Sequence, residues 1–271
     1  MYLYTALEDN FALTAIYSAF GDMRTADYYG KGEAHDFWEL VIVTEGEIGA
    51  TAGKNVHYLK KGEAILHAPG EFHNLWSEKN ERSGIIIFSF SAKEMPVSAS
   101  CTLKVSDLQR PREILAQIEH CFHKHKIWVQ AVREGQELAA CMAIKRLELF
   151  LLELLATKDT QRHAGSTPQS ARHFAEVVRY LEENVSLSLT VAQIAAACNL
   201  GEVNLKKIFS RYAGMGVMSY FTRLKIRAAV ALLEQGASVR EASDTLGFVS
   251  QNYFCTVFTR IMGKSPKNFK G

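Results

Sequence analysis

The sequence predicts an α+β protein of several parts: an N-terminal β-barrel with a helical segment, and a C-terminal all-α domain in which a connector helix joins two helix-turn-helix units. Short β-branched and aromatic runs separated by glycine turns fill most of residues 1–107. Apolar residues recur at helical spacing over residues 108–157. Two similar helical patterns follow in residues 171–271, after a polar stretch at residues 158–170.

Length and composition indicate a soluble globular protein of about two domains. The chain has 271 residues, of which 48% are hydrophobic and 22% charged, as in ordinary globular proteins. No apolar run reaches the roughly 18 residues that span a bilayer, and the start lacks the features of a signal peptide. We therefore expect a cytoplasmic protein without membrane contact. Five cysteines without a CxxC pair favour neither a disulfide framework nor a cysteine zinc site.

The charge of the chain is unevenly distributed. The whole chain carries 31 basic and 29 acidic residues, a formal net charge of +2. Residues 172–271 hold 13 of the basic and 7 of the acidic residues, a net of +6, which leaves 18 and 22, a net of −4, for the remainder. A basic module on an acidic body favours a polyanionic partner for that module alone.

The strands expected in residues 1–107 are short and about ten residues apart. Turns that contain a glycine separate them at residues 45–47, 53–55 and 60–63. This even spacing is typical of a β-sandwich or barrel. The strand-forming runs are residues 37–43, 48–52, 56–59, 64–67 and 85–90.

Residues 108–157 change to helical periodicity. Ile114, Ile118 and Phe122 lie at helical spacing, and a leucine-rich run continues to Leu155. The apolar surface of this run is wider than one stripe, so the helix must bury more than one face. Two explanations remain open: packing against the protein's own β-domain, or a dimer interface that also relays a signal.

An amphipathic helix opens the C-terminal domain. Residues 158–170 are polar and read as a linker, and Thr167-Pro168 within it resembles a helix start. The spacing i, i+3, i+4 and i+7 then predicts a buried helical face. Its residues are Phe174, Val177, Val178 and Leu181.

Two capping boxes mark the helix-turn-helix units that follow. Thr190 with Gln193, and Ser238 with Glu241, each place a hydroxyl three residues before a side chain that reaches back to the helix start. Each box precedes an apolar helical face, a turn with a glycine and a second helix that another glycine ends. Such a pattern predicts two short, well-defined helix pairs.

The two units repeat one another. Gly214 and Gly263 end their second helices 49 residues apart, and Leu205 and Phe254 hold the same inner position at the same separation. An internal duplication of this kind is hard to obtain by chance. A connector helix expected at residues 219–234 would set the two second helices about 34 Å apart, so that both enter successive major grooves of DNA.

Several short motifs occur together at fixed spacing in residues 189–270. They are Ile194-Ala195, Leu205-x-x-Ile208-Phe209, Gly214, Tyr220, Ala229-x-x-Leu232-Leu233, Gly247-Phe248, Gln251, Tyr253-Phe254, Phe258, Gly263 and Ser265-Pro266-x-x-Phe269. This stretch resembles the DNA-binding domain of the AraC/XylS family. The resemblance implies a sequence-specific transcriptional regulator, an activator by preference, whose partners are double-stranded promoter DNA, RNA polymerase and a second copy of the chain.

By this resemblance the second helix of each unit reads DNA. Lysine can reach guanine, and glutamine and asparagine can pair with adenine; a merely solvated helix face is the alternative for each residue. The family usually has basic residues where Thr256 and Thr259 stand, so we expect the first unit to supply more of the affinity. The expected DNA-contacting residues are Val203, Asn204, Lys206, Lys207, Ser210, Arg211, Gln251, Asn252, Cys255 and Thr256.

Residues 33–46 and 62–73 resemble the two motifs of the cupin barrel, in which histidines and a glutamate bind a metal. Glu33 stands at the place of the first histidine, which leaves His35, Glu39 and His73. These side chains suit Zn, Mn, Fe or Ni. Regulatory cupins of this type usually lack the metal, so the resemblance implies a cupin-like sensor domain, and no cofactor is expected.

Three interpretations of this site remain open. His35 and Glu39 can form a buried polar pair that fills the barrel. Glu33 can join His35, Glu39 and His73 in a metal site. Aromatic faces with a few polar groups can instead bind a small polar effector such as a carbohydrate, which the family resemblance also favours. The residues expected to line that effector pocket are His35, Trp38, Glu39, His73, Trp76 and Tyr28.

The favoured function is a ligand-responsive transcription factor rather than an enzyme. One alternative is a metal-dependent cupin enzyme fused to a DNA-binding domain, against which the glutamate at position 33 weighs. Another is a constitutive regulator whose cupin serves only to dimerise. Bound metal and turnover would distinguish the first alternative, and absence of any effector response the second.

Overall fold

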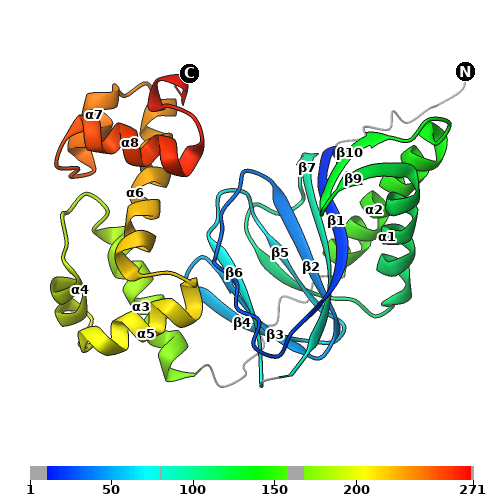
Figure 1. The fold of residues 1–271 in the computed structure, drawn as a ribbon, viewed down its shortest axis with the longest axis horizontal. Coiled ribbons are helices and arrows are strands. Elements are labelled where there is room, and N and C mark those ends of the chain that lie inside the picture. The colour runs from blue at the N-terminus through cyan, green and yellow to red at the C-terminus, as the bar shows by residue number, and fades with distance from the viewer. Residues whose placement is uncertain (1–10, 80, 158–167, 270–271) are drawn as a thin grey trace, which may run out of the picture. The chain divides into compact units, whose positions relative to one another are not determined.

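The computed structural model describes residues 11–79, 81–157 and 168–269, which form two compact units (Figure 1). The first unit contains ten strands and helices α1 and α2, and the second contains helices α3 to α8. Of the predicted helix start, Thr167 lies outside the described residues, and Pro168 is the N-cap of the first helix of the second unit rather than its first helical residue. Within the described ranges, no helix has the length and apolar character needed to cross a membrane.

A seven-stranded sheet forms the centre of the first unit. Its strand order is β8-β5-β2-β7-β1-β10-β9, and its neighbouring strands pair antiparallel. The strands are β1 (Ala12–Arg24), β2 (Trp38–Glu45), β5 (Glu63–His67), β7 (Ser83–Lys93), β8 (Cys101–Lys104), β9 (Phe122–His125) and β10 (Trp128–Val132).

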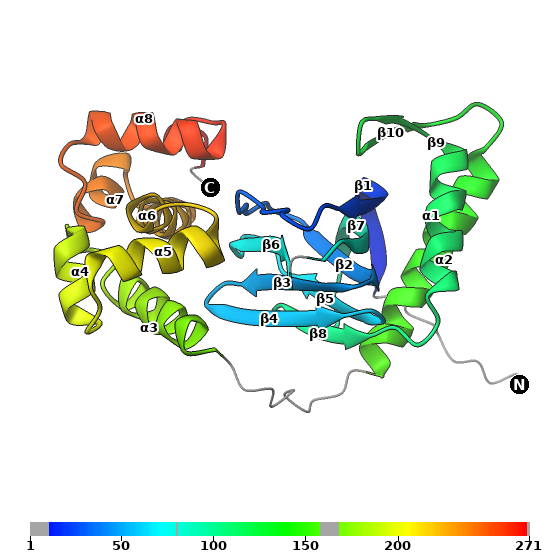
Figure 2. The same ribbon diagram turned by 60° about the horizontal axis from the view of Figure 1, so that its bottom comes forward.

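A second, three-stranded sheet in the order β4-β3-β6 lies over one face of the large sheet (Figure 2). It consists of β3 (Glu47–Ala52), β4 (Asn55–Lys60) and β6 (His73–Ser77). Val41 and Ile87 of the large sheet pack with Ile48 and Leu75 of the small one in a common core. The sheets form an open sandwich, so the predicted closed barrel is not confirmed.

Helices α1 (Gln109–Cys121) and α2 (Glu137–Ala156) cover the other face of the large sheet. Ile118 and Leu147 of these helices share a core with Leu40 and Phe88 of the sheet. The sequence did not predict the β9–β10 hairpin that lies between the two helices. Strand β10 extends the sheet beside β1, with Trp128 opposite Ser18.

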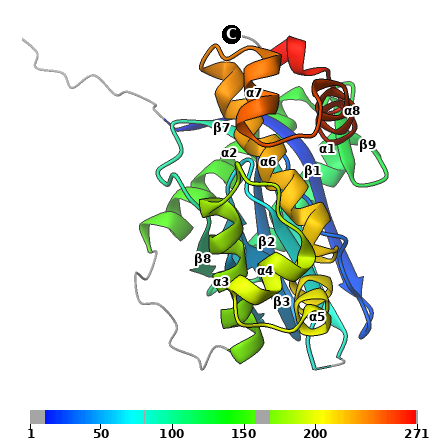
Figure 3. The ribbon, with the colours of Figure 1, turned by 90° about the vertical axis from the view of Figure 1, so that its left-hand side faces the viewer.

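The second unit is helical, and its helix α6 lies between two helix pairs (Figure 3). The predicted inner face of α3 is fully buried, from Phe174 to Leu181. The helices are α3 (Gln169–Glu183), α4 (Val191–Ala197), α5 (Glu202–Ala213), α6 (Val217–Glu234), α7 (Val239–Thr245) and α8 (Gln251–Met262), followed by a 3-10 helix, η1 (Pro266–Phe269).

Local signals position these helices as the sequence predicts. Both capping boxes are formed, at the starts of α4 and α7. Gly214 and Gly263 end α5 and α8 with φ of 64° and 69°, a left-handed conformation that favours glycine. Phe209 packs against Phe174 in the first half of the unit, and Phe254 against Phe258 in the second.

Candidate functional site

Helix α5 presents a polar and basic face to solvent. Its apolar side is buried through Leu205, Ile208 and Phe209. Lys206 lies 3.7 Å from Glu202 in a solvent-exposed ion pair, which is easily broken by a competing anion. The residues expected to contact DNA on this helix are all exposed: Val203, Asn204, Lys206, Lys207, Ser210 and Arg211.

Helix α8 presents amides and a hydroxyl instead of a cluster of cations. Of its four expected DNA-contacting residues, Gln251, Asn252 and Thr256 are exposed and Cys255 is half-buried. The hydroxyl of Thr256 donates a hydrogen bond to the backbone oxygen of Asn252 at 3.0 Å. Two exposed apolar residues nearby in the chain were not expected from the sequence: Val249, just before α8, and Tyr253 on it, which are 92% and 51% exposed. The sequence could have revealed both residues, because each is an apolar side chain that does not fit the i, i+3, i+4 pattern of the core.

A buried lysine supports the second helix pair. Nζ of Lys225 on α6 donates hydrogen bonds to the backbone oxygens of Val185 at 2.8 Å, Leu187 at 2.8 Å and Leu246 at 2.5 Å. Two of these acceptors lie after α3 and the third at the end of α7, so one ammonium of α6 joins two other stretches of the chain. Burial lowers the pKa of Lys225 to about 8, which leaves it protonated at neutral pH. The sequence did not single out this lysine.

The first unit holds a buried cluster of two histidines and a glutamate between its two sheets. Glu39 lies on β2 of the large sheet, and His73 begins β6 of the small one. The Glu39 carboxylate lies 3.7 Å from Nε2 of His35 and 3.5 Å from Nε2 of His73. The structure therefore brings together three of the residues that the sequence singled out.

Hydrogen bonds behind this cluster fix its side chains. Nδ1 of His35 lies 2.9 Å from the backbone oxygen of Phe37, and Nδ1 of His73 lies 3.0 Å from that of Glu71. Because a backbone oxygen only accepts, each Nδ1 carries a proton and donates it. The hydroxyl of Ser89 donates to the Glu39 carboxylate at 3.2 Å.

The electrostatics of the cluster follow from burial and mutual contact. Burial raises the pKa of Glu39, but the neighbouring His35 and His73 outweigh it and hold the pKa below its ordinary value. Burial lowers the pKa of His73, but Glu39 more than offsets it, so the pKa is raised. Burial lowers the pKa of His67 well below its ordinary value, which leaves that ring neutral.

His67 is a member of this region that the sequence did not reveal. It is fully buried and stacks on His73 with ring centroids 4.3 Å apart. It pairs directly with Glu39 across β2 and β5, so both side chains lie on the same face of the sheet. Strand register, which a single sequence does not reveal, was the missing information.

The structure separates both tryptophans from this cluster. Trp38 precedes Glu39 on the same strand, so it points to the opposite face and packs in the core beneath the helices. Trp76 is buried on the outer face of the small sheet, where it stacks on Tyr29. The sequence grouped them by residue type, although the two-residue period of a strand would have separated Trp38 from Glu39.

Two further residues from the predicted site lie at its margin. Tyr28 is half-buried and packs beside the inter-sheet core; burial raises its pKa, and the Arg24 guanidinium lies 4.3 Å from its ring centre. Glu33 is exposed, and it contacts His73 through backbone hydrogen bonds of 2.8 and 2.9 Å. Its carboxylate is not part of the buried cluster.

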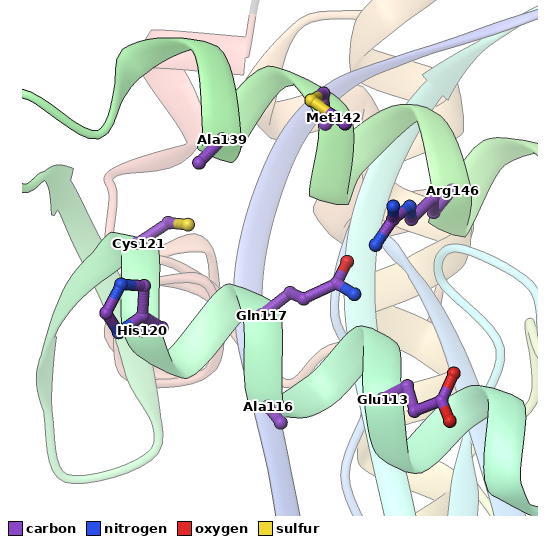
Figure 4. Close-up of a pocket in the computed structure, with 8 residues that line it drawn as sticks. All are labelled: Glu113, Ala116, Gln117, His120, Cys121, Ala139, Met142 and Arg146. Atoms are coloured by element: carbon purple, nitrogen blue, oxygen red, sulfur yellow. The ribbon is translucent and has the colours of Figure 1, made fainter.

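A surface groove of about 420 Å³ lies between α1 and α2 (Figure 4). Glu113 and Gln117 of α1 face Met142 and Arg146 of α2 across it. Beside the groove, α2 exposes the large apolar side chains Leu138, Met142, Leu149 and Leu152. This exposed surface belongs to the segment for which a dimer interface was one expectation.

Two family models match the chain. Residues 19–141 match an AraC-like ligand binding domain, and residues 194–271 match a helix-turn-helix domain. The first match runs from the middle of β1 to the start of α2, and the second from the middle of α4 to residue 271.

Curated relatives and solved structures show similarity at low identity. The uncharacterized HTH-type transcriptional regulator YfiF of Bacillus subtilis is 24% identical over 247 residues, which cover 87% of this chain and 77% of YfiF. The melibiose operon regulatory protein of Escherichia coli is 24% identical over 153 residues, which cover 53% of this chain and 51% of that protein. The structure of ToxT from Vibrio cholerae superimposes with a TM-score of 0.38 and 12% identity, covering 94% of this chain and 98% of ToxT.

Proposed function

Because the chain belongs to the AraC family of DNA-binding transcriptional regulators and carries a ligand-binding domain, we propose that it reads promoter DNA with two helix-turn-helix units, α4–α5 and α7–α8. The observation that carries this proposal is the exposure of polar residues on both α5 and α8, each behind a short capped helix. Helix α6 has 18 residues and is about 27 Å long, a length compatible with entry into successive major grooves.

The two reading helices would make different kinds of contact. Lys206, Lys207 and Arg211 on α5 carry positive charge for phosphates and guanine edges. Gln251 and Asn252 in the first turn of α8 offer amides that match the adenine edge. The exposed positions and the net charge of the C-terminal residues support this division.

The test is binding of the full-length protein to its own upstream DNA at several salt concentrations. The variant Lys206→Ala/Lys207→Ala should weaken binding and reduce the slope of log K against log salt by about 1 for each phosphate that the variant no longer neutralises. Lys60→Ala/Lys61→Ala removes the same charge from exposed positions of the first unit and serves as the matched control. If both variants bound DNA equally well, α5 would not contact the DNA. If the wild type showed no specific binding at any salt concentration, the proposal would be wrong.

We further propose that the first unit senses a small polar effector of the carbohydrate class and that the protein acts as an activator together with RNA polymerase. The buried polar groups between the sheets support such an effector, as does similarity to a regulator named for a melibiose operon. A thermal shift of the full-length protein with a panel of sugars tests the effector class. A melting temperature unchanged by the whole panel would favour a regulator whose first unit has only a structural role.

A homodimer through α2 is the third part of this proposal. Leu138, Met142, Leu149 and Leu152 are 75%, 49%, 51% and 38% exposed. With Lys145 they follow a spacing of four and three residues, which is that of a coiled-coil seam. A second copy of α2 would cover these apolar side chains, and the groove beside them would receive part of that helix.

A further inference from the structure

The spacing within the buried cluster is that of ligands around an ion rather than of hydrogen-bonded partners. The nitrogen–oxygen distances of 3.7 and 3.5 Å between the two Nε2 atoms and the Glu39 carboxylate exceed those of a charge-assisted hydrogen bond, about 2.8 Å. Atoms held about 2.05 Å from a four-coordinate ion lie about 3.4 Å apart. The ligand atoms of His35, Glu39 and His73 all lie within 4.8 Å of one another, so shifts of well under 2 Å would complete a coordination sphere.

The orientation of the rings adds to this geometry. Because Nδ1 of each ring is held at a backbone oxygen, each ring directs its other nitrogen, Nε2, toward the Glu39 carboxylate. Neither Nε2 has a hydrogen-bond partner among the described residues, although His73 is only 1% exposed. Buried polar atoms without a partner cost free energy, and a cation bound at this point would offset that cost.

The surroundings of the three side chains have the form that supports a metal site. Metal-binding histidines usually donate their other ring N–H to a backbone oxygen or a carboxylate, and the metal-binding carboxylate is itself hydrogen-bonded. His35 and His73 make such backbone contacts, and Ser89 donates to Glu39. Ser89 is itself held by the Ser18 hydroxyl at 2.7 Å.

We propose that His35, Glu39 and His73 bind one divalent first-row transition metal ion, of the zinc type, between the two sheets. Two imidazoles with one carboxylate suit such ions, whereas Mg²⁺ and Ca²⁺ prefer oxygen ligands alone. Glu33, which the sequence offered as a fourth ligand, is excluded by its exposed position. Three protein ligands leave room for water or for an oxygen atom of an effector, so the ion would form part of the proposed effector site.

The ion would add a direct link between the two sheets. Its ligands come from the segment at the start of β2 and from the first residue of β6, which belong to different sheets. Binding to the folded state alone raises stability by mass action. The thermal stability of the first unit should therefore rise with metal concentration and fall after treatment with a chelator.

Calorimetric titration of chelator-treated, full-length protein with zinc chloride tests this proposal. We expect one ion per chain at micromolar affinity or tighter. Glu39→Gln, which keeps the shape of the side chain and removes its charge, should weaken binding at least about 100-fold, and Ser89→Ala about 10-fold. His123→Gln/His125→Gln removes two exposed histidines of β9 and should leave the affinity unchanged, which excludes adventitious surface binding.

A second probe separates loss of the site from loss of the fold. Cobalt(II) chloride should give visible absorption bands of a nitrogen- and oxygen-ligated ion in the wild type and in the surface control, but not in Glu39→Gln or His73→Gln. Circular dichroism should show that the variants remain folded. Absence of zinc and cobalt binding in the wild type, or equal binding in Glu39→Gln and His73→Gln, would overturn the proposal. DNA binding is measured separately, so neither result bears on the reading helices.

Discussion

Replacing Lys225 by methionine should destabilise the helical unit by about 3 kcal/mol. The substitution keeps the length of the side chain and removes an ammonium that donates to three backbone oxygens. Each hydrogen bond from a charged donor contributes roughly 1.5–3 kcal/mol. The substitution also removes the cost of burying the charge, which is several kcal/mol. The hydrogen-bond contribution exceeds the cost of burying the charge, and the three carbonyl groups that lose their partner add to the difference. Together these effects give the expected net loss of stability.

The two units can be followed separately in one urea titration at pH 7. All three tryptophans, Trp38, Trp76 and Trp128, lie in the first unit, so tryptophan fluorescence reports on that unit alone. Circular dichroism at 222 nm reports on helices, most of which lie in the second unit. We expect the helical transition of Lys225→Met to move to lower urea while the fluorescence transition stays in place.

Two variants define what would refute this reasoning. Lys225→Arg keeps the charge and the donors and should recover more than half of the lost stability. Arg227→Met removes an exposed cation from the same helix, whose ion pair with Glu182 spans 4.0 Å, and should cost less than about 1 kcal/mol. If the free energy of unfolding of Lys225→Met is within about 0.5 kcal/mol of that of the wild type, the three hydrogen bonds do not stabilise the helical unit. Local hydrogen exchange in α7 should increase in the same variant.

Three further predictions concern packing, assembly and capping. In Gly49→Ala the new methyl group would overlap the buried ring of Trp76, so the fluorescence-detected melting temperature should fall by about 3–8 °C; an unchanged value would mean that the ring moves freely. Leu149→Glu should halve the mass measured by light scattering without loss of helicity, and a wild-type monomer would contradict the proposed dimer. Ser238→Ala removes the cap of α7 and should lower the free energy of unfolding of the helical unit by about 1 kcal/mol. Ser238→Asp should recover most of this free energy, because aspartate also caps helices.

The sequence predicted the helical unit well because its signals are local. Capping boxes, terminal glycines and the helical period each depend on residues within one or two turns. Lys225 was missed because its three acceptors lie 40, 38 and 21 residues away along the chain. A lysine in an amphipathic helix does not by itself indicate that segments distant in the sequence will bury it.

The first unit was less predictable because strand pairing is not local. Five strands were recognised, namely β2, β3, β4, β5 and β7, whereas β1, β6 and β8 were not. The arrangement in two open sheets depends on which strands become neighbours. The β9–β10 hairpin was missed because most of its residues are exposed and lack the alternation that marks a half-buried strand. His35, Glu39 and His73 were found through the resemblance to the cupin motifs, whereas the contact of His67 with them depends on the register between β2 and β5.

The contrast between α5 and α8 leads to a last expectation about how affinity and specificity are divided. The α5 face carries Lys206, Lys207 and Arg211, whereas the first turns of α8 offer Gln251 and Asn252 without a cation. Phosphate contacts give affinity that falls with salt, and base contacts give selectivity that changes little with salt. The α5 lysine variant should therefore lose affinity about equally on all sequences, while Gln251→Ala should keep the salt slope and lose discrimination at one base position. If Gln251→Ala instead weakened all sequences equally, α8 would have to act through the phosphates.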